Sequence, residues 1–184
     1  CVGCGQCVQV CPVGALTIHD DTDRIYKELI NGKILVAQVA PSVRVTIAEA
    51  LGEDPGTISP GRHVTALKKL GFHQVFDSDF SADLTIMEET KEFLNRVEKG
   101  ENLPLLTSCC PAWVKFITDQ YKEYVPNIST CRSPQGMMSA VIKEYFRDPE
   151  HAAGKKTVMV SIMPCTAKKA EAVRGEALSP CCPL

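Results

Sequence analysis

The sequence predicts an α/β fold in which a mostly parallel sheet is flanked by helices. From residue 33 onward, short apolar runs rich in Val and Ile alternate with longer stretches that carry helix start and stop residues. Strands that alternate with helices in this way are typical of parallel sheets. The chain has 184 residues, 45% of them hydrophobic, which suits one such domain and a small addition.

The individual elements follow from this alternation. The first strand ends before Ser42, which can cap a helix that stops at Gly52. Pro60 opens the next helix and Gly71 closes it, which is the order that helices prefer. We expect strands at residues 33–39, 72–76, 103–106 and 157–162, and helices at about 42–52, 60–71, 82–99, 111–117 and 134–146.

Four of the ten cysteines lie in the first eleven residues, in a C-x2-C-x2-C-x3-C run followed by Pro12. This is the spacing of a bacterial 4Fe–4S ferredoxin run, and it suits iron–sulfur ligation better than disulfides or zinc. The fourth cysteine of such a run ligates a second cluster, whose other ligands we expect upstream. Residues 1–18 are therefore interpreted as the remnant of a ferredoxin-like domain with two 4Fe–4S clusters, with the ligands Cys1, Cys4, Cys7 and Cys11.

Charge and hydropathy exclude two classes of partner. The net charge is −2, which does not favour binding to nucleic acid. No run of about 18 apolar residues is present, so the sequence predicts no transmembrane segment.

The remaining notable residues follow predicted strands. Ala40-Pro41-Ser42 follows the first strand, Cys109-Cys110 follows the third and Cys165 follows the fourth. Ligands of open parallel sheets collect at this edge. A cysteine at a helix N-terminus is also favoured as a thiolate by the helix dipole. On spacing alone, isolated cysteines like these are more often simply buried thiols.

The residues around these cysteines resemble a known family. TSCCPAW (residues 107–113) and MPCTAKK (residues 163–169) are similar to the first two signature motifs of the iron-only (FeFe) hydrogenases. The resemblance covers residues 1–178 and includes the ferredoxin-type run. It implies reversible formation of H2 from protons and electrons at an H-cluster, which is a 4Fe–4S cubane joined to a di-iron unit with CO, cyanide and dithiolate ligands.

The resemblance also implies roles for the motif residues. Cys110 and Cys165 would be metal ligands of the cubane, and Cys109 would pass protons as a thiol rather than bind metal. Lys168 would donate to a cyanide; otherwise it is a solvated helix lysine paired with Glu171 or Glu176. The remaining residues that would line the di-iron unit are Ala40, Pro41, Ser42 and Met163, whose plainer interpretations are a helix cap and ordinary core.

A proton path is implied as well. Glu89, Glu92 and Arg96 share one helix face, which by pattern alone is a charged flank of an amphipathic helix. The resemblance implies that Cys109, Glu89, Ser133, Glu92 and Arg96 form a relay, with Ser133 between the carboxylates and Arg96 near the exit. Cys131 matches no ligand of the family and is expected to be a core thiol.

The resemblance fails near the end of the chain. The third hydrogenase motif, which would supply the other two cubane cysteines, is absent, and Cys181 and Cys182 do not replace it. We therefore expect residues 19–32 to be a linker, residues 33–178 the N-terminal part of a catalytic domain, and residues 179–184 an atypical tail. As an isolated fragment, this segment is expected to be inactive.

Two functions are compatible with these motifs. The first is part of an FeFe-hydrogenase in the cytoplasm, with a ferredoxin-like electron donor or acceptor and with maturation proteins that install the di-iron unit. The second is a hydrogenase-like iron–sulfur assembly or carrier protein without hydrogen chemistry. The Cys109-Cys110 pair and the carboxylates Glu89 and Glu92 favour the enzyme.

Overall fold

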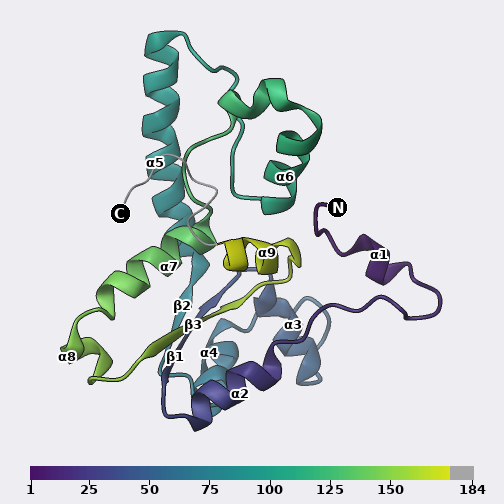
Figure 1. The fold of residues 1–184 in the computed structure, drawn as a ribbon. Helices are drawn as coiled ribbons and strands as arrows, with labels where there is room; N and C mark the ends of the chain where they lie inside the picture. The colour runs from purple at the N-terminus through teal and green to yellow at the C-terminus, as the bar shows by residue number, and fades with distance from the viewer. Residues whose placement is uncertain (175–184) are drawn as a thin grey trace. The chain divides into compact units, whose positions relative to one another are not determined.

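The computed structural model describes residues 1–174, which divide into two units (Figure 1). The first, which we call the sheet unit, comprises residues 19–80 and 138–164. The second, the helical unit, comprises residues 1–18, 81–137 and, of the described residues, 165–174. Each unit therefore combines segments that are far apart in the sequence, and each is described by itself below.

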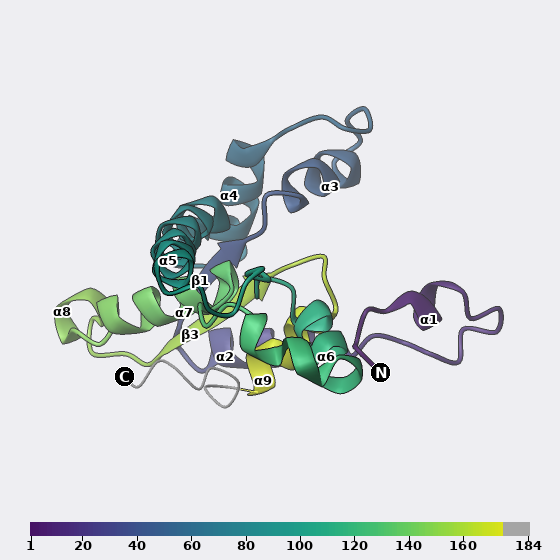
Figure 2. The same ribbon diagram turned by 90° about the horizontal axis from the view of Figure 1, so that it is seen from above.

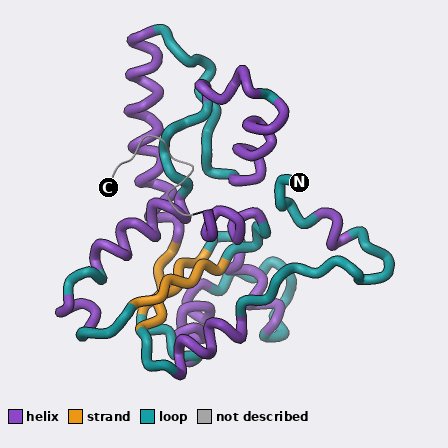
Figure 3. The backbone as a smooth tube through the Cα atoms, in the orientation of Figure 1, coloured by secondary structure: helices purple, strands orange, loops and turns teal. Residues whose placement is uncertain are grey.

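A three-stranded parallel sheet forms the centre of the sheet unit (Figure 3). Its strands are β1 (Ile34–Val39), β2 (Gln74–Asp77) and β3 (Thr157–Ile162), in the order β2-β1-β3. Val36 pairs with Gln74 on one side and with Met159 on the other. The predicted parallel α/β sheet is thus confirmed, with β1 as its central strand.

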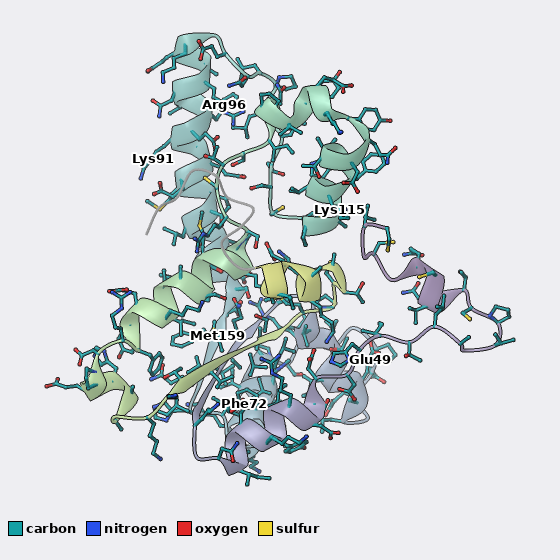
Figure 4. The ribbon with its side chains drawn as sticks, in the orientation of Figure 1. Glu49, Phe72, Lys91, Arg96, Lys115 and Met159 are labelled. Carbon is teal, nitrogen blue, oxygen red and sulfur yellow. The ribbon has the colours of Figure 1, made fainter. Side chains whose placement is uncertain are left out.

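All six residues of β1 are buried, because helices cover both faces of the sheet (Figures 1 and 2). Side chains of a strand alternate between faces. Ile34 and Val36 pack with residues of α7 (Pro134–Tyr145) and α8 (Pro149–Ala152). Leu35, Ala37 and Val39 pack on the other face, where α2 (Thr22–Ile30), α3 (Val43–Ala50) and α4 (Pro60–Lys69) supply the partners. Figure 4 labels one residue from each of these two clusters, Met159 and Phe72.

Gln38 is the polar exception in this buried strand. Its amide nitrogen donates to the hydroxyls of Ser139, at 3.1 Å, and Ser161, at 2.6 Å. The two serines come from α7 and β3, so a single buried side chain ties the central strand to its neighbour and to a covering helix. A buried amide is tolerated because it is hydrogen-bonded.

The remaining elements belong to the helical unit. Helix α5 begins directly after β2, and its residues from Ser81 onward belong to this unit. The other helices are short, as in the N-terminal segment, where α1 has four residues. The elements are α1 (Gln6–Gln9), α5 (Ser78–Lys99), α6 (Pro111–Gln120), the 3-10 helix η1 (Lys122–Asn127) and α9 (Ala167–Arg174).

The predicted strand at residues 103–106 is wrong. This segment makes a single parallel bridge, in which Leu106 pairs with Ile128. The Leu106 amide donates to Asn127 at 2.8 Å, and its carbonyl accepts from Ser129 at 2.7 Å. Pro104 has no backbone N–H to offer a neighbouring strand, so the apolar run does not extend into a ladder.

Two further expectations are modified. Ser42, expected as a helix cap, does precede α3, but its side chain makes no capping hydrogen bond. Residues 19–32, expected as a linker with one short helix, do contain the helix α2, but its Ile25 and Leu29 pack against the core of the sheet unit. The division of the chain into functional domains stays a prediction.

No helix within residues 1–174 is both long enough and apolar enough to cross a membrane. The longest, α5, has 22 residues, but it carries many charged side chains.

Replacement of Leu35 by Ala should destabilise the sheet unit. Leu35 is 1% exposed, so Leu35→Ala removes buried apolar atoms and leaves a cavity. We expect a loss of about 2–5 kcal/mol in the free energy of unfolding, measured by urea denaturation. Leu51 lies in the same unit and is 57% exposed, so Leu51→Ala is the matched control and should cost much less. Equal losses for the two variants would contradict the assigned core.

Candidate cluster-binding and proton-transfer site

The turn at Cys109-Cys110 presents two exposed thiols at the start of α6. Cys110 is the N-cap residue, in extended conformation, and Pro111 holds the first helical position. The Cys110 sulfur accepts a hydrogen bond from the backbone N–H of Trp113 at 3.4 Å. A sulfur at a helix N-terminus, with an N–H directed at it, is chemically suited to exist as a thiolate ligand.

Lys168 connects this turn to the second motif. Its ammonium donates to the carbonyl of Cys109 and to the carboxylate of Glu171, both at 2.8 Å. The amide of Gln135 also donates to Glu171, at 3.2 Å, and to the Lys168 carbonyl, at 3.3 Å. The ion pair with Glu171, expected for an ordinary helix lysine, is present, but the same ammonium also holds the backbone of the first motif.

Cys165 lies two residues before α9 and is exposed. Its carbonyl accepts from the backbone N–H of Lys168 at 3.1 Å. Cys109, Cys110 and Cys165 all belong to the helical unit, and the Lys168 contact places the two motifs side by side.

The N-terminal run also belongs to the helical unit. Cys1, Cys4 and Cys7 are exposed, and Cys11 is partly buried. Hydrogen bonds from the backbone N–H groups of Leu16, Val13 and Ala15 lower the pKa of the Cys11 thiol. A thiol surrounded by amide donors is favoured in its thiolate form, which is the form that binds metal.

The structure does not gather three or more histidine, cysteine, aspartate or glutamate side chains into a metal site anywhere in residues 1–174. The donor chemistry nevertheless fits iron–sulfur clusters. Soft thiolate ligands select such clusters. The N–H donors at Cys11 and Cys110 are the kind of contact that stabilises thiolate ligands and tunes a bound centre.

Glu92 and Arg96 form a largely buried ion pair on α5. Arg96 is 9% exposed and donates to a Glu92 oxygen at 2.6 Å. The same guanidinium donates to the carbonyls of Asn102, Pro126, Asn127 and Ile128 at 2.9–3.2 Å. Figure 4 labels Arg96 on a different side of α5 from Lys91, whose partner is the exposed Glu88. Arg96 is therefore buried, and its place near the exit of a proton path stays a prediction.

Further donors converge on Glu92. The hydroxyl of Ser129 donates to it at 2.8 Å, and the backbone N–H of Thr130 lies 3.1 Å from both of its oxygens. Burial raises the pKa of the Glu92 carboxyl, but the bonds from Ser129, Thr130 and Arg96 outweigh it and hold that pKa below its ordinary value. Glu92 is therefore ionised at neutral pH.

The hydroxyl next to Glu92 belongs to Ser129 and not, as expected, to Ser133. Ser133 is buried, and its hydroxyl accepts from the backbone N–H of Gly136 at 3.2 Å, so it caps the start of α7. A Ser-Pro pair at a helix start favours this local contact over one with a distant carboxylate. Ser129 lies four residues before Ser133, and the resemblance implied Ser133 for this role.

Glu89 and Cys131 lie near the same segment. A Glu89 oxygen is 3.4 Å from the backbone nitrogen of Ser108, directly before Cys109. The Ser108 hydroxyl donates to the Cys131 carbonyl at 2.6 Å, and the Cys131 thiol is 3.7 Å from Glu92. Burial raises the pKa of the Cys131 thiol, and the charges of Glu92 and Glu89 raise it further. The thiol expected to be plain core thus faces the carboxylates.

The residues expected to line a di-iron unit lie in the sheet unit. Ala40 follows β1 and donates to the carbonyl of Ile162 at 3.1 Å, so it lies beside the end of β3, where Met163 follows. Ala40, Pro41, Ser42 and Met163 therefore gather at one edge of the sheet, as the strand pattern predicted. Ser129, Gln135 and the second contact of Lys168 carried no sequence signal, because each depends on loop geometry.

Two protein families match this chain. Residues 33–179 match the C-terminal domain of the iron-only hydrogenase large subunit. Residues 1–17 match a 4Fe–4S binding domain. The chain belongs to the iron-only hydrogenase family.

Relatives of this hydrogenase-family chain include enzymes of two kinds. It is 48% identical to the NADP-reducing hydrogenase subunit HndD of Solidesulfovibrio fructosivorans, over 96% of this chain and 31% of that protein. It is 41% identical to the periplasmic iron hydrogenase large subunit of Nitratidesulfovibrio vulgaris, over 96% of this chain and 50% of that protein. The chain thus spans between about a third and a half of these relatives.

Other relatives differ in role or are known in three dimensions. The cytosolic iron–sulfur assembly component 3 of Mus musculus is 31% identical over 96% of this chain and 39% of that protein. A solved structure of a variant of the FeFe-hydrogenase HydA1 from Chlamydomonas reinhardtii has a TM-score of 0.78 and 42% identity, over 86% of this chain and 41% of that one. The family and structural matches support 4Fe–4S clusters and the H-cluster as the cofactors.

Loss of the Glu92 charge should lower the free energy of unfolding, by an amount that depends on pH. Because the folded-state pKa of Glu92 is depressed, its charge stabilises the protein above its unfolded pKa of about 4.3, and this stability is lost as the pH falls through the folded value. We expect Glu92→Gln to lower the free energy of unfolding by about 1–3 kcal/mol at pH 7. The difference from wild type should narrow below about pH 4.

Urea denaturation of wild type and Glu92→Gln, at pH 7 and at a pH below about 4, measures the difference in their free energies of unfolding. Glu88→Gln is the matched control on the same helix, because its ion pair with Lys91 is exposed and should contribute little. A deficit of Glu92→Gln that is the same at both pH values would contradict the assigned ionisation.

Proposed function

We propose that this chain is part of an FeFe-hydrogenase that interconverts protons, electrons and H2. The contact of Lys168 with the carbonyl of Cys109 carries the proposal, because it joins the two signature motifs within one unit. Residues 33–178 would be the N-terminal part of the catalytic domain and residues 1–18 the electron-entry segment. The third motif would complete the cubane from elsewhere in the full-length protein.

In this proposal, Cys110 and Cys165 supply two thiolate ligands of the cubane. The N–H of Trp113 supports Cys110 as an acceptor in its charged form. Lys168 has three N–H donors, and two of them are directed at Cys109 and Glu171. The third can donate to an anionic ligand such as cyanide. Bound at this turn, the H-cluster would supply the redox chemistry of H2.

Protons would travel along the carboxylates of α5. Cys109 would exchange a proton with Glu89, whose carboxylate lies next to the backbone of Ser108. The next hydroxyl is assigned to Ser129, since it contacts Glu92 at 2.8 Å, and Ser133 becomes a support that caps α7. Arg96 would stabilise the charged form of Glu92. Glu92 would therefore hold a proton only in passing, since its resting form is ionised.

We place this hydrogenase in the cytoplasm, with a ferredoxin-like protein as electron partner and with maturation proteins for the di-iron unit. The 4Fe–4S binding domain at residues 1–17 supports an electron-transfer partner. One relative is a periplasmic enzyme and another an NADP-reducing one, so compartment and partner vary among its relatives.

The competing proposal is an iron–sulfur assembly component, because one such protein is 31% identical over 96% of this chain. It requires clusters but no proton path. The thiol of Cys109 beside the proposed cubane ligand, with Glu89 next to the backbone of Ser108, has no proton to carry in that alternative, and this favours the enzyme.

Substitution of Cys109 separates the two functions. In the full-length protein with its di-iron unit installed, we expect H2 evolution driven by reduced methyl viologen. Cys109→Ala should lower this rate about 100-fold or more, the usual worth of a positioned proton carrier, while the iron content stays unchanged. Cys110→Ala is the contrasting variant, since it removes a ligand and should lower the iron content itself. A protein with its full complement of iron that evolves no H2 would favour the assembly function.

A further inference from the structure

The N-terminal cysteine run contacts the second motif through Thr166. The Thr166 hydroxyl donates to the carbonyl of Gly3 at 2.6 Å, across 163 residues of sequence. Thr166 directly follows Cys165, and Gly3 directly precedes Cys4. One hydrogen bond therefore joins the residue before Cys4, a candidate ligand of the N-terminal cluster, to the residue after Cys165, a candidate ligand of the cubane. Both partners belong to the helical unit.

The glycines of the run allow this close approach. Gly3 and Gly5 have φ values of 73° and 78°, in the left-handed region that favours glycine. A Cβ on Gly5 would lie 2.9 Å from the Thr166 hydroxyl oxygen and 3.2 Å from its methyl carbon. A Cβ on Gly3 would meet only ordinary contact, 3.7 Å from the Cα of Ala167. Gly5 is thus restricted both by its backbone conformation and by the space that Thr166 occupies.

The contact lies at the first turn of α9. Ala167, the first residue of that helix, is buried, and Gly3 lies against it. The C-V-G-C-G-Q-C segment therefore packs on the same short helix that carries Lys168, whose ammonium holds the Cys109 backbone. The N-terminal run, the first motif and the second motif meet around α9.

We propose that Thr166, packed against Gly5, positions the 4Fe–4S cluster of the N-terminal run for electron transfer to the cubane held by Cys110 and Cys165. This proposal rests on the proposed hydrogenase function. One electron passes from the reduced N-terminal centre to the oxidised cubane, and no covalent bond forms or breaks. A low-potential one-electron donor, reduced ferredoxin, restores the reduced state of the N-terminal centre.

Thr166 acts here as a positioning residue, since its partner is a peptide carbonyl. Electron transfer between two protein-bound centres depends steeply on their separation, so a contact that fixes the separation sets the rate. Functional geometry of this kind must be held to within about 0.5 Å, which rigid hydrogen-bonded contacts achieve. The link from Cys4 through Gly3 and Thr166 to Cys165 contains one hydrogen bond and otherwise only covalent bonds.

The test compares Thr166→Val, which removes the hydroxyl, with Thr166→Ser, which keeps it, in the full-length holoprotein. The first measurement is hydrogen–deuterium exchange of the peptide that covers residues 2–8. Thr166→Val should exchange about 5-fold faster, as expected for loss of one hydrogen bond, and Thr166→Ser should stay near wild type.

The second measurement separates electron supply from chemistry at the H-cluster. Exchange of H2 with D2O to give HD and HDO needs no external electron, whereas H2 evolution from reduced ferredoxin needs two. Thr166→Val should lower the ferredoxin-driven rate on the order of 10-fold, within the loss that a misplacement of about 1 Å can cause. The rate of H2/D2O exchange should not change, and Thr166→Ser should restore the ferredoxin-driven rate.

The glycines supply a matched pair. Gly5→Ala adds a methyl group that collides with Thr166, and Gly3→Ala places the same methyl group at the same kind of backbone conformation without a collision. We expect Gly5→Ala to lower the ferredoxin-driven rate more than Gly3→Ala. Equal effects of the two would contradict the packing of Gly5 against Thr166.

Every other outcome also decides the proposal. Unchanged deuterium exchange or an unchanged ferredoxin-driven rate in Thr166→Val would overturn it, and so would an equal fall in the ferredoxin-driven rate and in H2/D2O exchange. Absence of H2/D2O exchange in the wild-type holoprotein would instead overturn the hydrogenase function. Reduction of the cubane by ferredoxin, followed by its electron paramagnetic resonance signal, would then decide the role of Thr166 by the same comparison of variants.

Discussion

The buried guanidinium of Arg96 organises the loops that follow α5. Its two terminal nitrogens contact the carbonyls of Asn102, Pro126, Asn127 and Ile128 and the carboxylate of Glu92. A buried charge without such partners would be strongly unfavourable. The loops after α5 therefore adopt the positions in which their carbonyls accept hydrogen bonds from Arg96. The bridge between Leu106 and Ile128 and the contacts of Ser129 and Thr130 with Glu92 all follow from this arrangement. The turn that carries Cys109 begins three residues after Leu106, so its starting point depends on the same set of contacts.

The helical unit places two different chemical environments near one another. Around α9, thiols and a lysine meet backbone carbonyls and N–H groups, which suits a negatively charged metal centre. Along α5, carboxylates contact hydroxyls, N–H groups and a guanidinium, an environment that suits the transfer of single protons. Ser108 belongs to both environments, because its nitrogen faces Glu89 and its neighbour is Cys109. Lys168 pairs with Glu171 beside the thiols, whereas Glu92 pairs with Arg96 on α5. The charges around the thiols and the charges along α5 therefore have separate partners.

Much of the fold could be predicted from the sequence, and the failures have local causes. The strands at residues 34–39, 74–77 and 157–162 were predictable because apolar runs bounded by glycine and proline dominate their neighbourhoods. The strand predicted at residues 103–106 does not form, because Pro104 lacks the backbone N–H that a ladder requires. In the site, the motif placed Cys110 at the start of a helix and the strand pattern placed Cys165 after a strand, whereas neither pointed to Ser129. Whether Ser129 or Ser133 faces Glu92 depends on how the loop is pinned by Arg96, and that pinning uses backbone carbonyls, which any sequence possesses.

The central position of β1 has a consequence for how the chain folds during synthesis. Gln38 and Ser161, which are hydrogen-bonded across β1 and β3, are separated by 123 residues. After β2 has been made, β1 can pair on one side only, and its other edge presents unpaired amides and apolar side chains until β3 leaves the ribosome. Exposed strand edges invite pairing with other chains, and non-local pairings form slowly. The sheet unit is therefore most vulnerable to aggregation between the synthesis of β2 and that of β3, while residues 78–156 are being translated.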